Sequence, residues 1–256
     1  MNKHQKKIMN YLTEHTQTDV DTLSKKVALS SSTIRRQLSE LQEKGLLVRT
    51  HGGAMLPNPI HYGSYFETRV TCQMEAKRMI ASLAKKQLTP NLIIGISGGS
   101  TCTELARQLR ALSGFTIVTN ALNIAIEMQG PLSNRIIVTG GVLNQSSYEL
   151  VGNQVAESLK NVSLDIAFLG CSGIDCAFGF SMFDEPEAVA GRAFMAASRK
   201  TIVLADHTKL SRTEFARLCP IEAVDMLITD EGVSDEQIRS LKKVNLEVLV
   251  ASTDLK

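Results

Sequence analysis

The run Ser97-Gly98-Gly99-Ser100-Thr101 has the composition of an anion-binding loop. It follows the apolar stretch 92–96 and precedes residues that are expected to form a helix. Glycines let the backbone approach a negative group, the hydroxyls donate hydrogen bonds, and a helix N-terminus presents free N–H groups and a partial positive charge. Tight packing of a strand on a helix would use similar residues, so this loop alone leaves both interpretations open.

Small or polar residues also follow other apolar stretches of the chain. They are Asn120, Gly140, Gly141, Gly173, Asp175, Asp206 and Lys209. Ligands of open α/β sheets bind beyond the carboxyl ends of the strands, so these residues and loop 97–101 are expected to line one site. Lys209 would add a positive charge, and Asp206 would bind a sugar hydroxyl. Neither GxxxxGK[ST] nor GxGxxG occurs, so the pattern predicts a phosphorylated small molecule rather than ATP or a dinucleotide, and no cofactor.

A second group of residues, near the N-terminus, has the chemistry of DNA recognition. Its members are Ser31, Ser32, Thr33, Arg35, Arg36 and Gln37, followed by Arg49 and His51. Ser and Thr bind phosphates or base edges, Arg pairs with guanine, and Gln pairs with adenine. Arg49 and His51 would contact the DNA backbone or the minor groove. The alternative is a small helical domain with a solvated basic face.

Three helices would position this second group. The apolar spacing predicts a helix over 4–14, a second that Asp19 or Asp21 caps, and a third that Ser30 or Ser31 caps. The residues expected to point inward from the last two helices are Val20, Leu23, Val27, Ile34, Leu38 and Leu41. Two short helices separated by about three residues, the second opening with small polar residues and arginines, form the helix-turn-helix pattern.

The residues after the third helix predict a wing and a linker. The helix should run to about Lys44 and end at Gly45, before a strand over 46–50 and a tight turn over 51–54. Pro57-Asn58-Pro59 then marks a linker, and 65–86 is expected to be one helix. The predicted domains are therefore 1–56 for DNA binding, 57–74 as linker and lead-in helix, and 75–256 as the domain that binds the phosphorylated ligand.

The larger domain is expected to be a mostly parallel α/β sheet covered by helices, because short apolar runs alternate with amphipathic segments. The expected strands are 92–96, 115–119, 135–139, 164–169, 201–205, 225–229 and 246–250. Continuous apolar strands of this kind suit a sheet that is buried on both faces. The acidic cluster 184–187 either lines the ligand site or caps the helix that follows, and we favour the cap.

Charge and composition limit the possible classes of protein. The net charge is +2, but residues 1–56 carry +4 and the remainder −2, as expected if only the N-terminal end meets a polyanion. The five cysteines are scattered without a CxxC pair, which argues against a disulfide framework and a metal site. No secretory signal or membrane-spanning apolar stretch is present, so the protein is expected to be cytoplasmic and to have no membrane partner.

Several segments resemble the DeoR family of bacterial transcription regulators. They are TIRRQLSELQEKGLLVRTHGGA (33–54), IVTNALNI (117–124), VTGGVLNQSSYELVG (138–152), LGCSGIDCAFG (169–179) and VLADHTKLSR (203–212). The resemblance implies a sensor fold related to ribose-5-phosphate isomerase and an effector that is a phosphorylated sugar or a close relative. Gln37 stands where the family usually has Asp, which removes an acid from the DNA face. Ser97 stands where the family usually has an acid.

Two functional hypotheses follow. The first is a transcription regulator, expected to repress a carbohydrate-metabolism operon. In it, residues 30–54 bind double-stranded operator DNA, and a sugar phosphate controls that binding. A homo-oligomer is expected because paired half-sites match palindromic operators. The second is a sugar-phosphate isomerase with a DNA-binding appendage, in which Asp175, Asp206, Glu187 and Lys209 would supply acid–base groups. We favour the regulator because no close acid–base pair can be identified. The sign of regulation, the operator and the sugar stay open.

Overall fold

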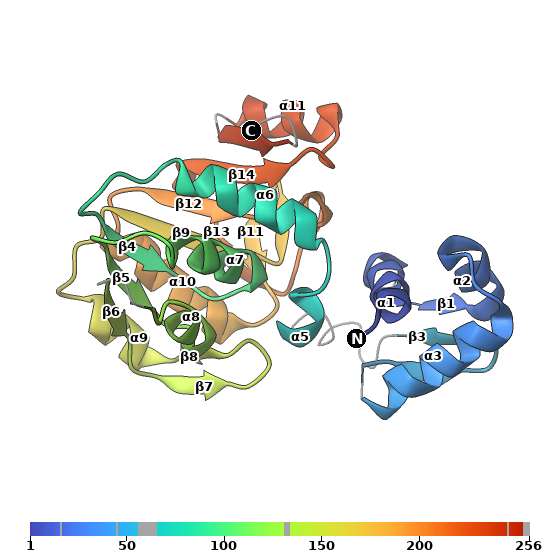
Figure 1. The fold of residues 1–256 in the computed structure, drawn as a ribbon. Coiled ribbons are helices and arrows are strands. Elements are labelled where there is room, and N and C mark those ends of the chain that lie inside the picture. Colours follow the sequence, from blue (N-terminus) through green and yellow to red (C-terminus); the bar gives the residue numbers. More distant parts are fainter. Residues whose placement is uncertain (16, 45, 56–65, 131–133, 245, 253–256) are drawn as a thin grey trace. The chain divides into compact units, whose positions relative to one another are not determined.

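A computed structural model of the chain shows two compact units, Met1–Gln73 and Met74–Lys256 (Figure 1). The structure describes residues 1–15, 17–44, 46–55, 66–130, 134–244 and 246–252. The expected helix end at Gly45 and the expected linker Pro57-Asn58-Pro59 lie outside these residues. Among the described helices, none is long and apolar enough to cross a membrane.

The first unit holds the predicted helices α1 (Lys3–His15), α2 (Val20–Val27) and α3 (Ser31–Glu43). The residues that precede α2 and α3 cap these helices. Asp19 accepts a hydrogen bond from the Thr22 amide, and Ser30 accepts one from the Thr33 amide. Such caps satisfy amides that have no partner within the helix. The six residues expected to point inward are all buried, and they pack with Ile8, Met9 and Leu12 of α1 in one core.

A three-stranded sheet in the order β1-β3-β2 forms the wing. Its strands are β1 (Gln17–Asp19), β2 (Val48–Thr50) and β3 (Gly53–Met55). The turn at His51 and Gly52 joins β2 to β3, as the sequence predicted for the wing tip. Strand β1 was not predicted, because three residues between two helices are too few to show an alternating pattern.

The predicted helix over 65–86 is wrong, because two helices occupy this stretch. They are α5 (Phe66–Arg69) and α6 (Met74–Lys85), and turn residues 70–73 separate them. Gln73, directly before α6, has a φ of 48°, which lies in the left-handed region and cannot belong to a continuous right-handed helix. The apolar spacing of 65–86 did not reveal this interruption, since it depends on one backbone angle.

The second unit is built on a seven-stranded sheet in which every neighbouring pair is parallel, in the order β15-β14-β12-β9-β4-β5-β6. The strands are β4 (Ile93–Ile96), β5 (Thr116–Thr119), β6 (Arg135–Val138), β9 (Ile166–Gly170), β12 (Thr201–Leu204), β14 (Met226–Asp230) and β15 (Glu247–Ala251). All seven predicted strands are confirmed, to within one or two residues at their ends. The α/β class follows from this sheet and its covering helices.

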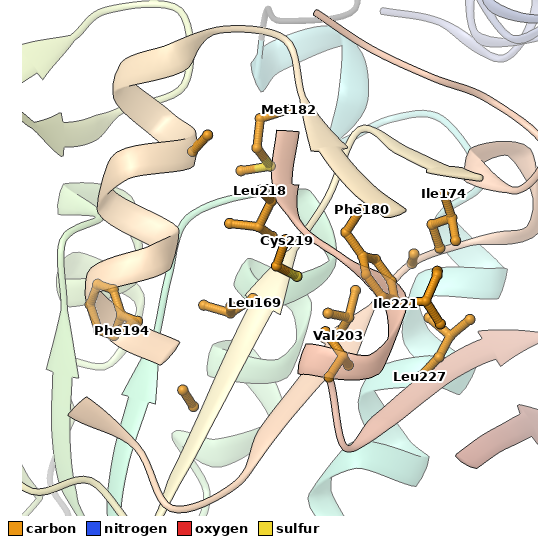
Figure 2. Packing of buried hydrophobic residues seen from close by; sticks show 14 of the residues in the cluster. Leu169, Ile174, Phe180, Met182, Phe194, Val203, Leu218, Cys219, Ile221 and Leu227 are labelled. Atoms are coloured by element: carbon orange, nitrogen blue, oxygen red, sulfur yellow. The ribbon is translucent and has the colours of Figure 1, made fainter. Parts of the chain in front are cut away.

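Two hydrophobic cores lie on opposite faces of the sheet. One contains residues of α6, α7 (Ser100–Leu109) and α8 (Leu122–Glu127), and the other contains residues of α9 (Asn153–Leu159), α10 (Glu185–Ala197) and α11 (Asp235–Lys243). Within β12, Val203 belongs to the second core while Ile202 and Leu204 belong to the first, as the two-residue period of a strand requires. Figure 2 shows Phe194 of α10 and Val203 in the second core.

Smaller antiparallel elements were not predicted. Strands β7 (Val142–Asn144) and β8 (Glu149–Val151) form a hairpin, and β10 (Gly173–Asp175), β11 (Gly179–Met182) and β13 (Ala216–Cys219) form a third sheet. The short helices η1 (His207–Lys209) and η2 (Ile221–Ala223) follow β12 and β13. The β7–β8 hairpin, the β10–β11 pair and η1 follow β6, β9 and β12, so they lie in the loops at the carboxyl ends of these strands.

Candidate DNA-binding surface and effector site

Helix α3 presents a polar face made of the residues that the sequence assigned to DNA. Ser32, Arg35 and Arg36 are exposed, and Ser31 and Thr33 are half-buried. The side chain of Arg36 is 72% exposed, and its contact with Glu40 is long, at 4.0 Å. Because Ile34, Leu38 and Leu41 anchor the opposite face, the two arginines extend away from the core of their unit.

Gln37 does not belong to this exposed face, contrary to the expectation. Only 4% of it is exposed, and its Oε1 accepts a hydrogen bond of 2.8 Å from Asn2 Nδ2. Its Nε2 donates to Glu40 Oε1 at 3.4 Å. The reason is position: Gln37 adjoins Leu38 and lies three residues after Ile34, so it turns toward α1 rather than outward.

The wing is bonded to helix α3. Arg49 Nη1 of β2 donates a hydrogen bond of 3.0 Å to Ser39 Oγ, which in turn donates to the Arg35 carbonyl at 3.1 Å. Arg49 and His51 are both exposed. The bond fixes the position of Arg49 relative to the arginines of α3, so the wing and the helix can present cations to one partner.

The loop 97–101 joins the carboxyl end of β4 to the N-terminus of α7. Gly99 stands at the N-cap with a φ of 103°, a conformation that strains residues with a Cβ, and no described side chain caps the helix. Ser97, Ser100 and Thr101 are buried. An uncapped helix N-terminus with hydroxyl groups in its first turn is suited to bind an anion.

A buried carboxylate contacts this loop. Glu149 of β8 is 3% exposed, and its Oε2 accepts a hydrogen bond of 3.3 Å from Asn120 Nδ2. A Cβ at Gly98 would overlap the Glu149 side chain, so a glycine is required there. Burial, and then the charge of Glu149, raise the pKa of the neighbouring Cys102 thiol. The sequence reasoning missed Glu149 because its partners are 29 and 51 positions away in the chain.

Buried polar atoms without a partner in the described residues lie at the same ends of the strands. They include Asn120 Oδ1, Thr139 Oγ1 and Ser147 Oγ. Asn120 follows β5 and Thr139 follows β6, two neighbouring strands of the sheet, and Ser147 lies in the hairpin loop two residues before Glu149. A buried polar atom without a partner is costly, and a polar ligand or water would satisfy it.

Asp206, at the carboxyl end of β12, lies between two lysines. Its Oδ2 is 4.0 Å from Lys77 Nζ of α6, and both side chains are almost fully buried. Burial raises the pKa of Asp206, but the charges of Lys209 and Lys77 and the Thr208 hydrogen bond outweigh it, so the pKa lies below its ordinary value. Lys77 was missed as a site residue, although a lysine between Ala76 and the buried Ile80 of an amphipathic helix signals an inward-facing charge.

The neighbouring strand, β14, ends in a second buried carboxylate. Asp230 is 3% exposed and binds His207 twice, through the backbone amide and through Nδ1, at 2.7 Å in each case. Burial raises the pKa of Asp230, and the hydrogen bonds and charge of His207 lower it below the ordinary value. This pair holds η1, and with it Lys209, against the end of the sheet.

The remaining predicted residues are placed less directly. Asp175 Oδ1 accepts hydrogen bonds from the amides of Ala177 and Phe178, so it closes the β10–β11 turn, and Gly173 pairs with Ser181 inside that sheet. Gly140 donates to Ser158 Oγ. Gly141 has a φ of 146° and packs on the β7–β8 hairpin. These four residues shape the loops at the carboxyl ends of the strands.

The acidic cluster 184–187 caps helix α10, which is the interpretation that the sequence analysis favoured. Asp184 is the N-cap of α10 and accepts a hydrogen bond of 3.0 Å from the Glu187 amide. Asn144 of β7 also donates to both Asp184 Oδ2 and Glu187 Oε1 at 3.1 Å. The cluster therefore supports the β7–β8 hairpin as well as the helix.

Comparison with known proteins decides the class. Residues 4–59 match the DeoR-like helix-turn-helix domain, and residues 72–231 match the DeoR C terminal sensor domain. The chain belongs to the DeoR family. It is a DNA-binding transcription regulator, as the resemblance of its motifs implied.

Relatives of similar length carry regulator names. The chain is 30% identical to the HTH-type transcriptional regulator GolR of Listeria innocua, over 97% of this chain and 98% of the relative. It is 33% identical to the glycerol-3-phosphate regulon repressor of Escherichia coli K12, over 86% and 88%. Among solved structures, ribose 5-phosphate isomerase A of Methanocaldococcus jannaschii matches 54% of each chain, with 18% identity and a TM-score of 0.38.

Proposed function

We propose that this regulator binds operator DNA through α3 and the wing, and that a phosphorylated sugar bound at the end of the large sheet changes that binding. The observation that carries the proposal is the α7 N-terminus without a side-chain cap, together with buried polar groups that follow β5 and β6 and lie in the β7–β8 hairpin loop. The phosphate would meet the amides and hydroxyls of loop 97–101, with Lys209 as a further cation. Repression of a carbohydrate operon is the expected role, since the relatives include a repressor of a glycerol-3-phosphate regulon.

Helix α6 offers a route from this site to the DNA-binding unit. It is the first helix of the second unit, and its residue Lys77 pairs with Asp206 at the ligand end of the sheet. A ligand that engages Asp206 or Lys209 changes the charge that holds the start of α6. Since the chain continues from this start into the DNA-binding unit, we expect the Lys77–Asp206 pair to contribute to the coupling of the two sites.

Binding without turnover is expected, because the three carboxylates among the candidate acid–base groups have structural partners. Asp175 closes a turn, Asp206 faces Lys77, and Glu187 accepts from Asn144. An isomerase assay on pentose and hexose phosphates tests this directly. Conversion of any of them at an enzymatic rate would favour the isomerase alternative.

The main test is a fluorescence-anisotropy titration of the protein on its own upstream DNA, at several salt concentrations, with and without sugar phosphates. We expect salt-sensitive binding that one sugar phosphate shifts about tenfold, or about 1.4 kcal/mol of coupling. Lys209→Ala should reduce this shift, whereas Lys160→Ala, an exposed lysine of the same unit, should not. Binding no tighter than to random DNA under every ligand would contradict the proposal. A homo-oligomer is expected, and light scattering measures it.

A further inference from the structure

Glu149 is a carboxylate placed where a bare anion would be repelled. It is buried, contacts the backbone of Gly98 in the loop proposed to bind phosphate, and is held by Asn120. A negative charge this close to an anion site weakens the binding of an anion by itself, because burial lowers the local dielectric constant. The site therefore favours a ligand that brings hydrogen-bond donors to the carboxylate together with the phosphate.

The atoms around Glu149 accept hydrogen bonds. Its carboxylate is an acceptor, and Asn120 Oδ1 is a fully buried acceptor without a partner in the described part of the chain. Asn120 cannot turn its amide group freely, because Nδ2 donates to both Glu149 Oε2 and the Leu150 carbonyl. Thr139 and Ser147 add hydroxyls at neighbouring positions. Adjacent hydroxyl groups of a polyol match such a set.

We infer that Glu149 is the residue that selects the effector, accepting hydrogen bonds from sugar hydroxyls and discriminating against phosphates that lack them. This inference rests on the proposed function, because it assumes that the phosphate occupies loop 97–101. A site built to bind a hydroxyl rejects an analogue without it strongly, because a buried acceptor such as Asn120 Oδ1, which has no partner within the described part of the chain, then stays unsatisfied. Selectivity is therefore expected to depend on the carboxylate, and phosphate binding on the loop.

The geometry provides two independent ways to disturb this carboxylate. Glu149→Gln keeps the size of the side chain but removes the charge and replaces one acceptor with a donor. Gly98→Ala leaves Glu149 chemically intact but displaces it, because the added Cβ would overlap its side chain. Glu157→Gln is the matched control, since Glu157 is an exposed glutamate of α9 in the same unit.

The experiment is calorimetric titration of the full-length wild type and the three variants. The probes are ribose 5-phosphate, 2-deoxyribose 5-phosphate, fructose 6-phosphate, glycerol 3-phosphate and inorganic phosphate. We expect the wild type to bind one hydroxylated probe at least tenfold more tightly than inorganic phosphate. Glu149→Gln should reduce that ratio about tenfold, by weakening the sugar phosphate rather than inorganic phosphate. Gly98→Ala, which lies in the phosphate loop itself and displaces Glu149, should weaken the sugar phosphate at least as much. Glu157→Gln should keep the wild-type ratio.

The outcomes separate the inference from the proposed function. If the folded wild type binds none of the sugar phosphates, the proposed effector class is wrong, and the role of Glu149 falls with it. If the wild type binds a sugar phosphate and both variants keep its ratio to inorganic phosphate, the role of Glu149 alone is overturned. Loss of all phosphate binding in Glu149→Gln, with its unfolding midpoint unchanged, would also overturn it, because the residue would then support the loop rather than select the sugar.

Discussion

The two units of the chain hold their functional side chains in opposite ways. On α3 and the wing, Arg35, Arg36, Arg49 and His51 are exposed, and the backbone beneath them is fixed by an apolar core. In the sensor, Glu149, Asp206 and Lys77 are buried, Asp206 pairs with Lys77, and Glu149 is hydrogen-bonded to Asn120. A surface that meets a polyanion benefits from long cations that water already solvates. A small-molecule site needs groups whose positions are set before the ligand arrives.

This difference shows where function and stability are separate and where they are the same. Removing an exposed arginine leaves its unit folded, because the side chain contributes little to packing. Removing a buried charge leaves its partner buried without compensation, so stability and ligand binding fall together. The following predictions test this distinction.

The largest effect is expected for Arg35→Ala combined with Arg36→Ala. Each bidentate base contact is worth about 1–3 kcal/mol, so operator affinity should fall at least about 100-fold, and the salt dependence should weaken. The unfolding free energy should change by no more than about 0.5 kcal/mol. Anisotropy and urea unfolding measure the two quantities. Arg239→Ala, an exposed arginine of the sensor, is the control; equal loss in that variant would mean that general charge, not contact, was removed.

The next effect is expected for Asp206→Asn. The variant removes the carboxylate that faces the buried Lys77, which should destabilise the sensor by about 3 kcal/mol. Urea unfolding of the full chain measures this change, and Asp235→Asn, in the exposed first turn of α11, should stay within about 0.5 kcal/mol of the wild type. An Asp206→Asn variant as stable as the wild type would show that the Lys77 pair contributes nothing to folding.

A smaller effect is expected for Gln37→Ala. Because Gln37 is bonded to Asn2 and Glu40, its loss should cost about 1 kcal/mol of stability in the first unit. The affinity of the variant should be measured on the operator and on a set of operators that each carry one base-pair replacement. Relative to the wild type, it should fall by the same factor on all of them. A change of preference at one base pair would instead place Gln37 in the groove, as its residue type first suggested.

The smallest expected effect is the loss of folding stability when the pH is lowered. The pKa values of Asp206 and Asp230 both lie below the ordinary 3.8. Their contribution to stability is therefore complete above the unfolded pKa and is lost as the pH falls through the folded pKa. In thermal unfolding, the melting temperature of the wild type should fall between pH 6 and pH 2. The fall should be smaller in Asp206→Asn, which lacks one of the two carboxylates. A sensor whose stability rises on acidification would contradict the sign.

Much of the fold was predictable because its signals are local. The cap at Asp19, the inward spacing of Ile34, Leu38 and Leu41, and the seven apolar strands each depend on residues within a few positions of one another. The helix over 65–86 failed for the opposite reason. Its apolar spacing continues through Gln73, whose left-handed backbone angle the spacing does not report.

The sequence by itself determined the seven strands of the large sheet and the three helices of the first unit, since the hydrophobic period of each element can be seen along the chain. Only the tertiary structure decided which charges meet in the sensor. Glu149 reaches Gly98 from a hairpin far along the chain, and Lys77 reaches Asp206 across the sheet end. It also turned Gln37 toward Asn2. Partners of buried polar groups are set by packing between distant segments, and no local pattern encodes that packing.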